Sequence, residues 1–322
     1  MNDQLKYFFN RPLQLVPEYK DYVWGGSRLR AGISPTAEAW VVYEGGVVST
    51  LPFAGKSLAE LAAAYPVELL GERSLESAGA RFPLLIKLLD SADWLSLQVH
   101  PNNEQALRLE GPGFQGKTEA WHVVEAAPEA QIIAGFRSEV SSAAVSEAIR
   151  EGNLLDYTQY LTVRSGETLF IPPGTLHSIG PGLLLYEVQQ SSNLTYRVYD
   201  WDRPQVGGRV LHIEKSLEVV DPSLHPQMVP APHLRDGERQ VLVSNRYFTL
   251  EMLFAQTQRL NLNTQALSFH ALTILEGAGT IRTQTGSLRI KRFESALIPA
   301  ACGAYEVSVL ESPLKCLVAF VS

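Results

Sequence analysis

Cysteine and long apolar runs are both scarce in this chain. Its two cysteines, Cys302 and Cys316, have no CxxC spacing and no nearby histidines, which excludes a zinc finger or redox motif and indicates core thiols. No stretch approaches the roughly 20 apolar residues of a membrane span, and the first residues show no signal-peptide core. We therefore expect a cytoplasmic protein with no membrane partner.

Positive charge is also in short supply. The chain carries 27 Lys and Arg against 34 Asp and Glu, a formal net charge of −7 at pH 7. This balance argues against a nucleic-acid partner. An anionic small molecule would have to meet a local cluster of cationic side chains.

The hydrophobic pattern favours a mostly β protein. With 322 residues, 45% of them hydrophobic, the chain is long enough for one to three domains. Helical patterning is confined to Leu58–Leu70, Asn103–Leu109 and Val140–Leu155. Short β-rich segments between Gly, Pro and polar turns predict strands at Glu38–Tyr43, Ala120–Val124, Gln131–Phe136, Thr168–Ile171, Leu183–Val188, Thr249–Phe254 and Leu272–Leu275. An antiparallel sandwich or small barrel with packed helices fits this pattern.

A weak internal repeat divides the chain. The segment from Thr168 to His177 resembles Ser295 to Ala304, and the second copy follows Leu275–Ile281, which we interpret as a strand, a glycine turn and a strand. Two β-barrel halves are therefore expected, the second degenerate because Ala304 replaces His177. The proline-rich stretch 221–238 is the expected linker. We predict one domain at 1–238, which carries the chemistry, and a degenerate domain at 239–322.

One motif in the first copy is specific. Gly166, Pro172, Gly174 and His177 have the spacing of the second cupin motif, which predicts a cupin (jelly-roll) fold. The glycines and proline form a fixed bend, after which His177 begins a strand. For the histidine alone, a structural role in a Pro-Gly hairpin is the ordinary alternative.

Alternating polar residues supply further candidate ligands. Gln98 and His100 leave one face of a strand, as do Lys117, Glu119 and Trp121. With His177, this pattern gives the candidate metal-ligand set Gln98, His100, Glu119 and His177. Two imidazoles, a carboxylate and an amide suit one Zn²⁺ per chain, and Mn, Fe, Co and Ni remain possible. His122 has the opposite parity to Glu119, and we expect it in the core.

Several separated segments resemble the type I phosphomannose isomerase family in its shorter bacterial form. The matching segments lie between about residues 12 and 220: Trp24-Gly-Gly26, Glu38-Ala-Trp40, Pro83–Lys87, Leu95–Pro101, Gly116–Glu119, the cupin string ending at His177, and Thr195–Arg203. The resemblance implies a zinc-dependent cupin that interconverts mannose 6-phosphate and fructose 6-phosphate. Longer members carry a large helical insertion for which this chain has no room.

The resemblance also implies residue roles. The family's metal ligands fall on the four candidates named above, its catalytic arginine on Arg197, its motif glutamate on Glu187 and its lysine near the substrate on Lys117. Phosphate contacts fall on Lys87 and Ser96, and a second cationic position, a lysine in longer members, falls on Arg203. In this acidic chain, these cationic side chains would form the local positive cluster that an anionic substrate requires.

Some choices stay open at this stage. Aldose–ketose isomerisation needs a base, and Glu187, Lys117 or a metal-bound water could serve; we slightly favour Glu187. Glu187 could instead be a structural ion-pair partner of Arg197. The rival functions are an isomerase of another phosphosugar, a non-catalytic sugar-binding regulatory cupin, and a cupin dioxygenase. The oligomeric state is not predicted.

Overall fold

The computed structural model describes residues 7–322 except 31, 34, 138–139 and 206–208. The chain divides into two compact units, one made of 1–19, 39–88 and 232–322, the other of 20–38 and 89–231. The break at 231/232 lies within the stretch 221–238 that the sequence suggested as a linker. Residues 1–19 and 39–88, however, group with the C-terminal segment, whereas the sequence placed them in a continuous domain 1–238. Within the described residues, no helix is long and apolar enough to cross a membrane.

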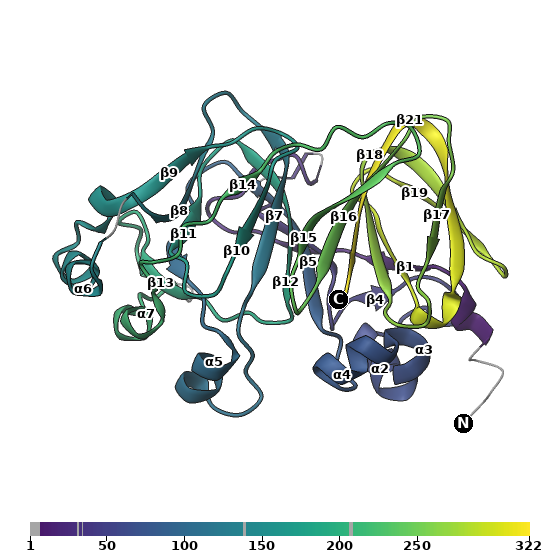
Figure 1. The fold of residues 1–322 in the computed structure, drawn as a ribbon, viewed down its shortest axis with the longest axis horizontal. Coiled ribbons are helices and arrows are strands. Elements are labelled where there is room, and N and C mark those ends of the chain that lie inside the picture. Colours follow the sequence, from purple (N-terminus) through teal and green to yellow (C-terminus); the bar gives the residue numbers. More distant parts are fainter. Residues whose placement is uncertain (1–6, 31, 34, 138–139, 206–208) are drawn as a thin grey trace. The chain divides into compact units, whose positions relative to one another are not determined.

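The unit that contains the C-terminus is built on a nine-stranded antiparallel sheet. Its main path is β15-β16-β21-β18-β20-β1-β4, with β17 on β21 and β19 on β18. The strands are β1 (Leu13–Val16), β4 (Val47–Val48), β15 (Arg239–Ser244), β16 (Thr249–Ala255), β17 (Leu260–Asn263), β18 (His270–Arg282), β19 (Ser287–Lys291), β20 (Ser295–Ile298) and β21 (Ala304–Phe320). The helical elements are two 3-10 turns (Tyr7–Asn10, Ala300–Cys302) and the helices α2 (Leu58–Ala64), α3 (Pro66–Leu70) and α4 (Glu72–Ala78), which gather together in Figure 1.

Two sequence expectations in this unit need correction. The stretch Leu275–Ile281 is not a strand, turn and strand, because β18 runs through it with register shifts against β21 around Gly277. Gly277 has φ 73°, which lets the strand bulge without turning back. The unit also has no closed barrel among its described strands, since the sheet is an open path.

The other unit is a two-layer sandwich. One layer contains β14-β10-β7-β12, followed in the same seven-stranded sheet by β5-β3-β2; the second is the five-stranded sheet β13-β6-β11-β8-β9. These two sheets are formed by β2 (Glu18–Lys20), β3 (Glu38–Val42), β5 (Leu84–Ser91), β6 (Leu97–Val99), β7 (Glu119–Ala126), β8 (Gln131–Phe136), β9 (Thr158–Thr162), β10 (Thr168–Ile171), β11 (His177–Ile179), β12 (Leu183–Gln190), β13 (Tyr196–Tyr199) and β14 (Met228–Val229). Residues 18–19 of β2, 39–42 of β3 and 84–88 of β5 group with the unit that contains the C-terminus. The helical elements are α5 (Asn103–Glu110), α6 (Ser142–Glu151), a 3-10 turn (Leu154–Tyr157) and α7 (Ile213–Val219).

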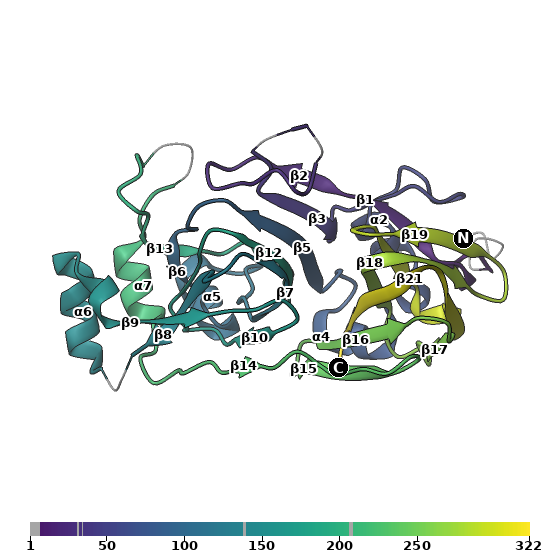
Figure 2. The same ribbon diagram turned by 90° about the horizontal axis from the view of Figure 1, so that it is seen from above.

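Alternation along the strands of this sandwich separates two apolar clusters. Both sheets contribute residues to one buried cluster, which includes Trp121, Leu185 and Ile132. The side chains of this cluster therefore fill the space between the layers. Leu97 and Val99 belong to a second cluster with residues of α6 and α7, so these helices cover the outer face of the five-stranded sheet. In both ribbon views α6 and α7 lie side by side (Figures 1 and 2). Side chains alternate between the two faces of a strand, so the residues that alternate with Leu97 and Val99 point the other way, into the sandwich interior.

The helix and strand predictions are largely confirmed. The expected strands at Gln131–Phe136 and Thr168–Ile171 are β8 and β10, and four others fall within longer strands. The strand expected at Glu38–Tyr43 is β3, which ends one residue earlier. The expected helix at 58–70 is split into α2 and α3 by Pro66, which begins α3. The helices α4 and α7 were not predicted. Part of the expected linker forms β14, which pairs with β10.

Candidate metal centre and active site

One row of paired residues crosses the inner face of the five-stranded sheet. Gln98 on β6 is the register partner of His177 on β11 and of Arg197 on β13. Side chains of directly paired residues leave the same face of a sheet. The neighbours Leu97, Val99, Tyr196 and Val198 pack in the outer cluster, so this row faces inward. The fold thus brings together three predicted site residues that are up to 99 positions apart.

A second set of polar side chains faces them from the other sheet. Glu119 and Trp121 on β7 pair with Gln189 and Glu187, respectively, on β12. Trp121 belongs to the interior cluster, and Glu119, two residues away, shares its face. The indole Nε1 of Trp121 donates to Oε1 of Glu187 at 3.1 Å, which places Glu187 on that face as well. The two inner faces therefore supply the candidate site.

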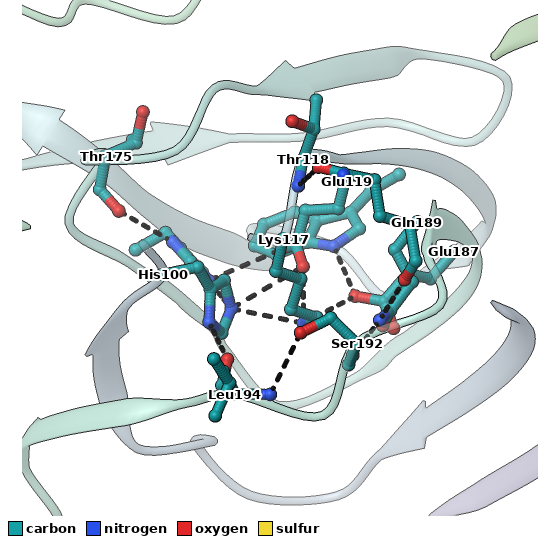
Figure 3. Close-up of polar contacts among 12 residues, drawn as sticks. His100, Lys117, Thr118, Glu119, Thr175, Glu187, Gln189, Ser192 and Leu194 are labelled. Carbon is teal, nitrogen blue, oxygen red and sulfur yellow. Dashed lines mark hydrogen bonds and ion pairs between the residues drawn. The ribbon is translucent and has the colours of Figure 1, made fainter. Parts of the chain in front are cut away.

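His100, Glu119 and His177 converge in this interior. Figure 3 labels His100 and Glu119 of this group. The ligand atoms of the three residues all lie within 4.8 Å of one another, and each side chain is at most 1% exposed. The two Nε2 atoms are 3.1 Å apart, and the Glu119 carboxylate lies 3.5 Å from His100 Nε2 and 3.3 Å from His177 Nε2. This is the one such group of His, Cys, Asp and Glu found in the described part of the chain.

The hydrogen bonds of the two imidazoles suit metal binding. His100 Nδ1 lies 2.8 Å from the carbonyl of Leu194, and His177 Nδ1 lies 2.9 Å from the carbonyl of Thr175. A carbonyl only accepts, so each Nδ1 carries the proton and each Nε2 presents a lone pair. Burial, with a smaller effect of the Lys117 ammonium, lowers the pKa of His177 to about 3, which keeps this imidazole neutral at pH 7.

Lone pairs and a carboxylate at such short separations repel unless a cation lies among them. Lys117 supplies part of that charge, since its Nζ is 2.5 Å from Glu119 Oε2 and 3.1 Å from His100 Nε2. His177 Nε2, in contrast, contacts His100 Nε2 and Glu119 Oε1, both of which are acceptors. Two neutral imidazoles and a carboxylate are a donor set that divalent metals favour, and the residues present fit such an ion.

The predicted amide ligand stands next to this group. Gln98 is half-buried and lies directly across from His177, on the inner face. Gln98 lies close to His177 because the register of β6 and β11 pairs the two residues. A role as fourth ligand is thus compatible with its place in the sheet.

Lys117 and Glu187 border the metal group on the side of β7 and β12. Lys117 is 5% exposed, and its Nζ lies 3.8 Å from Glu187 Oε1. Glu187 is 3% exposed and also receives the Trp121 hydrogen bond. Both residues predicted to act near the reacting carbons therefore lie beside the candidate ligands (Figure 3).

The predicted cationic residues have different surroundings. Arg197 Nη1 donates to the Val210 carbonyl at 3.2 Å, and burial, followed by the charge of Arg209, lowers the pKa of its guanidinium. Arg203 contacts Asp200 at 3.3 Å, Asp93 at 2.6 Å and the Trp94 carbonyl at 2.8 Å. Arg203 is therefore already held by two carboxylates.

The two predicted phosphate contacts also differ. Ser96 is buried two residues before Gln98. Lys87 belongs to the other unit, where its Nζ lies 5.5 Å from the Trp40 ring centroid.

Some of the site was not predicted. His122 is buried and bonds Thr168 at 3.0 Å, as its parity indicated, whereas His225 and His233 are exposed. The backbone carbonyls that orient the two imidazoles carry no sequence signal. Gln189, which pairs with Glu119, was also missed, because the predicted strand Leu183–Val188 ended one residue before it, whereas β12 continues to Gln190.

The fold and the buried histidine–glutamate group together define a cupin with a candidate metal site. The family described as phosphomannose isomerase type I, catalytic domain, matches residues 13–137. The chain is 34% identical over 302 residues to a mannose-6-phosphate isomerase of Streptococcus mutans, covering 89% of this chain and 92% of that protein. It is 31% identical over 321 residues to mannose-6-phosphate isomerase ManA of Bacillus subtilis, covering 95% and 98%. The chain belongs to the type I phosphomannose isomerase family.

Solved structures agree with this assignment. The crystal structure of the mannose 6-phosphate isomerase from Bacillus subtilis superposes with a TM-score of 0.85 at 27% identity, covering 96% of this chain and 99% of that one. A putative mannosephosphate isomerase from Archaeoglobus fulgidus gives a TM-score of 0.77 at 22% identity, with 96% of each chain covered, which shows the shared fold. The cupin fold expected from the sequence is thereby confirmed.

Proposed function

We propose that this chain is a mannose-6-phosphate isomerase that uses one Zn²⁺ to interconvert mannose 6-phosphate and fructose 6-phosphate. The observation that carries the proposal is the buried group of His100, Glu119 and His177, with Lys117 in direct contact and Glu187 beside it. Relatives over most of the chain carry the name of this activity. The group has the donors for a metal and the neighbours for proton transfer.

Gln98, His100, Glu119 and His177 would hold the metal. A bound divalent ion supplies Lewis acidity that polarises the sugar carbonyl and organises the adjacent oxygens, without redox chemistry. Zn²⁺ suits two nitrogens and two oxygens in a buried setting, and Mn, Fe, Co and Ni are the alternatives for the same donors. The protein orients the ligands through the carbonyls of Leu194 and Thr175.

Glu187 is the preferred base. The reaction moves a proton between carbons 1 and 2 of the sugar through a cis-enediol, which requires an acceptor on one face of the carbon chain. Trp121 and Lys117 both approach Oε1 of Glu187 and thereby fix the carboxylate in place. The Lys117 ammonium forms an ion pair with Glu119. Lys117 therefore serves better as a positive charge beside the substrate oxygens than as the proton acceptor.

The remaining residues would stabilise the negative charge of the enediolate and of the phosphate. Arg197 stands in one row with Gln98 and His177, and its guanidinium offsets the charge that develops on the enediolate oxygens without exchanging a proton. Lys87, Ser96 and Arg203 would bind the phosphate, as their family positions imply. For Arg203 this requires phosphate to displace the exposed carboxylate of Asp93, while buried Asp200 keeps the guanidinium oriented.

A coupled assay on the purified protein tests the function. Mannose 6-phosphate, glucose 6-phosphate and other phosphosugars would each be offered before chelation, after chelation, and after return of single metals. We expect turnover of mannose 6-phosphate that is lost on chelation and restored most fully by Zn²⁺. Faster turnover of glucose 6-phosphate, or sugar binding without turnover by metal-loaded protein, would contradict the proposal.

A further inference from the structure

Gln189 is a fully buried amide on the inner face of β12. It pairs in register with Glu119, and Leu185, four residues before it, fills the sandwich interior. Glu187, between these two residues, meets Trp121 on that face. Alternation along β12 therefore directs the Gln189 side chain to the side of the sheet that bears Glu119. Figure 3 shows Gln189 next to Glu187 and Ser192 at the edge of the site.

The orientation of the Gln189 amide is determined by its neighbours. One nitrogen donates to two backbone carbonyls, that of Gln190 at 3.0 Å and that of Ser192 at 2.5 Å. Carbonyl oxygens only accept, so the group facing them must be the NH₂. A flipped amide would set an oxygen against two oxygens. Oε1 is consequently the atom that points away from the loop at 190–192.

This oxygen lacks a donor within the described residues, although Gln189 is 0% exposed. Leaving a buried acceptor without a hydrogen bond is unfavourable, and a donor on a bound ligand would remove that cost. The adjoining residue shows the contrast. Gln190 faces the opposite side, and its amide is satisfied at both ends, by Thr118 N at 3.0 Å and Asn103 Oδ1 at 3.1 Å.

We propose that Gln189 Oε1 accepts a hydrogen bond from a hydroxyl of the sugar, which makes Gln189 a specificity-determining residue. The proposal rests on the proposed function, since it needs a polyhydroxy substrate beside Glu119. The hydroxyls on carbons 3 and 4 are the candidates, because carbons 1 and 2 react, the carbon 5 oxygen closes the ring, and carbon 6 carries the phosphate. A site that offers a buried acceptor rejects an analogue that lacks the matching hydroxyl.

A purely structural role for Gln189 makes different predictions. Its NH₂ ties down the loop at 190–192, and the Leu194 carbonyl, farther along the same segment, orients His100. If tying the loop were its whole role, replacing Gln189 would reduce bound metal and thermal stability. It would leave the preference among sugar hydroxyls unchanged.

The test pairs variants with substrate analogues. Gln189→Met removes the acceptor and the donors, while Gln189→Glu keeps an acceptor of the same length and loses the donors. Gln190→Met is the matched control from the same strand and opposite face. Each protein would be assayed with mannose 6-phosphate and its 3-deoxy and 4-deoxy analogues, and metal content and Tm would be measured in parallel.

We expect wild-type enzyme to lose about tenfold or more in kcat/KM with one of the two deoxy analogues. Gln189→Met should turn over that analogue and the full sugar almost equally, Gln189→Glu should keep part of the preference, and Gln190→Met should keep all of it with a lower Tm. Wild-type enzyme indifferent to both analogues would overturn the proposal even if Gln189→Met fails to fold. So would Gln189→Met with an unchanged preference, or with loss of metal as its sole effect. An inactive wild-type enzyme would instead refute the proposed function.

Discussion

The two copies of the internal repeat have similar backbones and different chemistry. In the first, β10 ends at Ile171, a Pro-Pro-Gly bend follows, and β11 begins at His177. In the second, β20 ends at Ile298, a 3-10 turn follows Pro299, and β21 begins at Ala304. The aligned residues His177 and Ala304 thus occupy the same place after the bend. His177 is fully buried, whereas Ala304 is exposed.

The second half keeps a buried histidine of another kind. His270 is 7% exposed, its Nδ1 lies 2.8 Å from the Tyr305 hydroxyl, and its ring packs 5.0 Å from that of Phe320. In the described part of the chain, no three His, Cys, Asp or Glu side chains converge around His270 as they do around His177. The two cysteines are buried here as core thiols, and burial raises the pKa of each to about 12. A shared bend is therefore not sufficient for chemistry; converging side chains are also needed.

The sharpest way to break this comparison is to remove the two histidines of the candidate metal group in the first half. His100→Ala combined with His177→Ala should abolish stoichiometric metal binding and reduce kcat by on the order of a thousandfold or more, because two of the four donors are gone. Metal analysis and steady-state kinetics measure both effects.

Two variants in the second half serve as controls. His270→Ala should leave the metal content unchanged, and Ala304→His should add no ion. Retention of one ion per chain by the double variant would place the metal elsewhere.

Arg197 tests whether the first half is a catalyst or only a metal site. Replacement by alanine should lower kcat by about a hundredfold or more with KM and metal content nearly unchanged, since the arginine acts on charge that develops in the transition state. Arg197→Lys should not rescue activity, because an ammonium cannot reproduce the planar guanidinium.

The alternative for Arg197, a structural ion pair with Glu187, predicts a different pattern. Thermal stability or metal content would then fall in step with activity. A stable, metal-loaded Arg197→Ala enzyme with near-normal kcat would refute the catalytic role.

Lys87 separates substrate binding from the chemical step. Because it is proposed to contact phosphate and no reacting atom, Lys87→Ala should raise KM about tenfold with little change in kcat. Lys56→Ala, at an exposed surface ion pair with Glu60, is a control that should change neither constant. A fall in kcat at constant KM would move Lys87 to the chemical step.

A last difference between the halves concerns stability rather than activity, and it is confined to acidic pH in the second half. Burial, and secondarily Arg239, lowers the pKa of His270 to about 4 from its usual 6.5. The unfolded chain binds this proton more readily, so the contribution is complete above pH 6.5 and is lost as the pH falls toward 4. His270→Gln, which does not titrate, should lose about 3 kcal/mol less stability over that interval than wild type. Denaturant unfolding at several pH values checks this difference, and equal slopes would contradict it.

Much of the fold was predictable because local rules specify it. The alternation in Gln131–Phe136 and Thr168–Ile171 matched β8 and β10, and the Pro-Gly bend correctly placed the start of β11 at His177. The failure at Gly277 has a physical cause, since a glycine with positive φ serves a turn or a bulge equally well. Only the pairing of β18 with β21 decides between the two.

By itself, the sequence determined which residue types and strand faces were available. Parity put Gln98 with His100 and Glu119 with Trp121, and the cupin spacing selected His177. Only the tertiary structure decided which of these side chains meet, because cross-strand register joins positions far apart in the chain, such as Gln98 with Arg197 and Glu119 with Gln189. It also decided that the Leu194 and Thr175 carbonyls orient the two imidazoles, since a backbone carbonyl is the same in every residue and becomes specific only through its position.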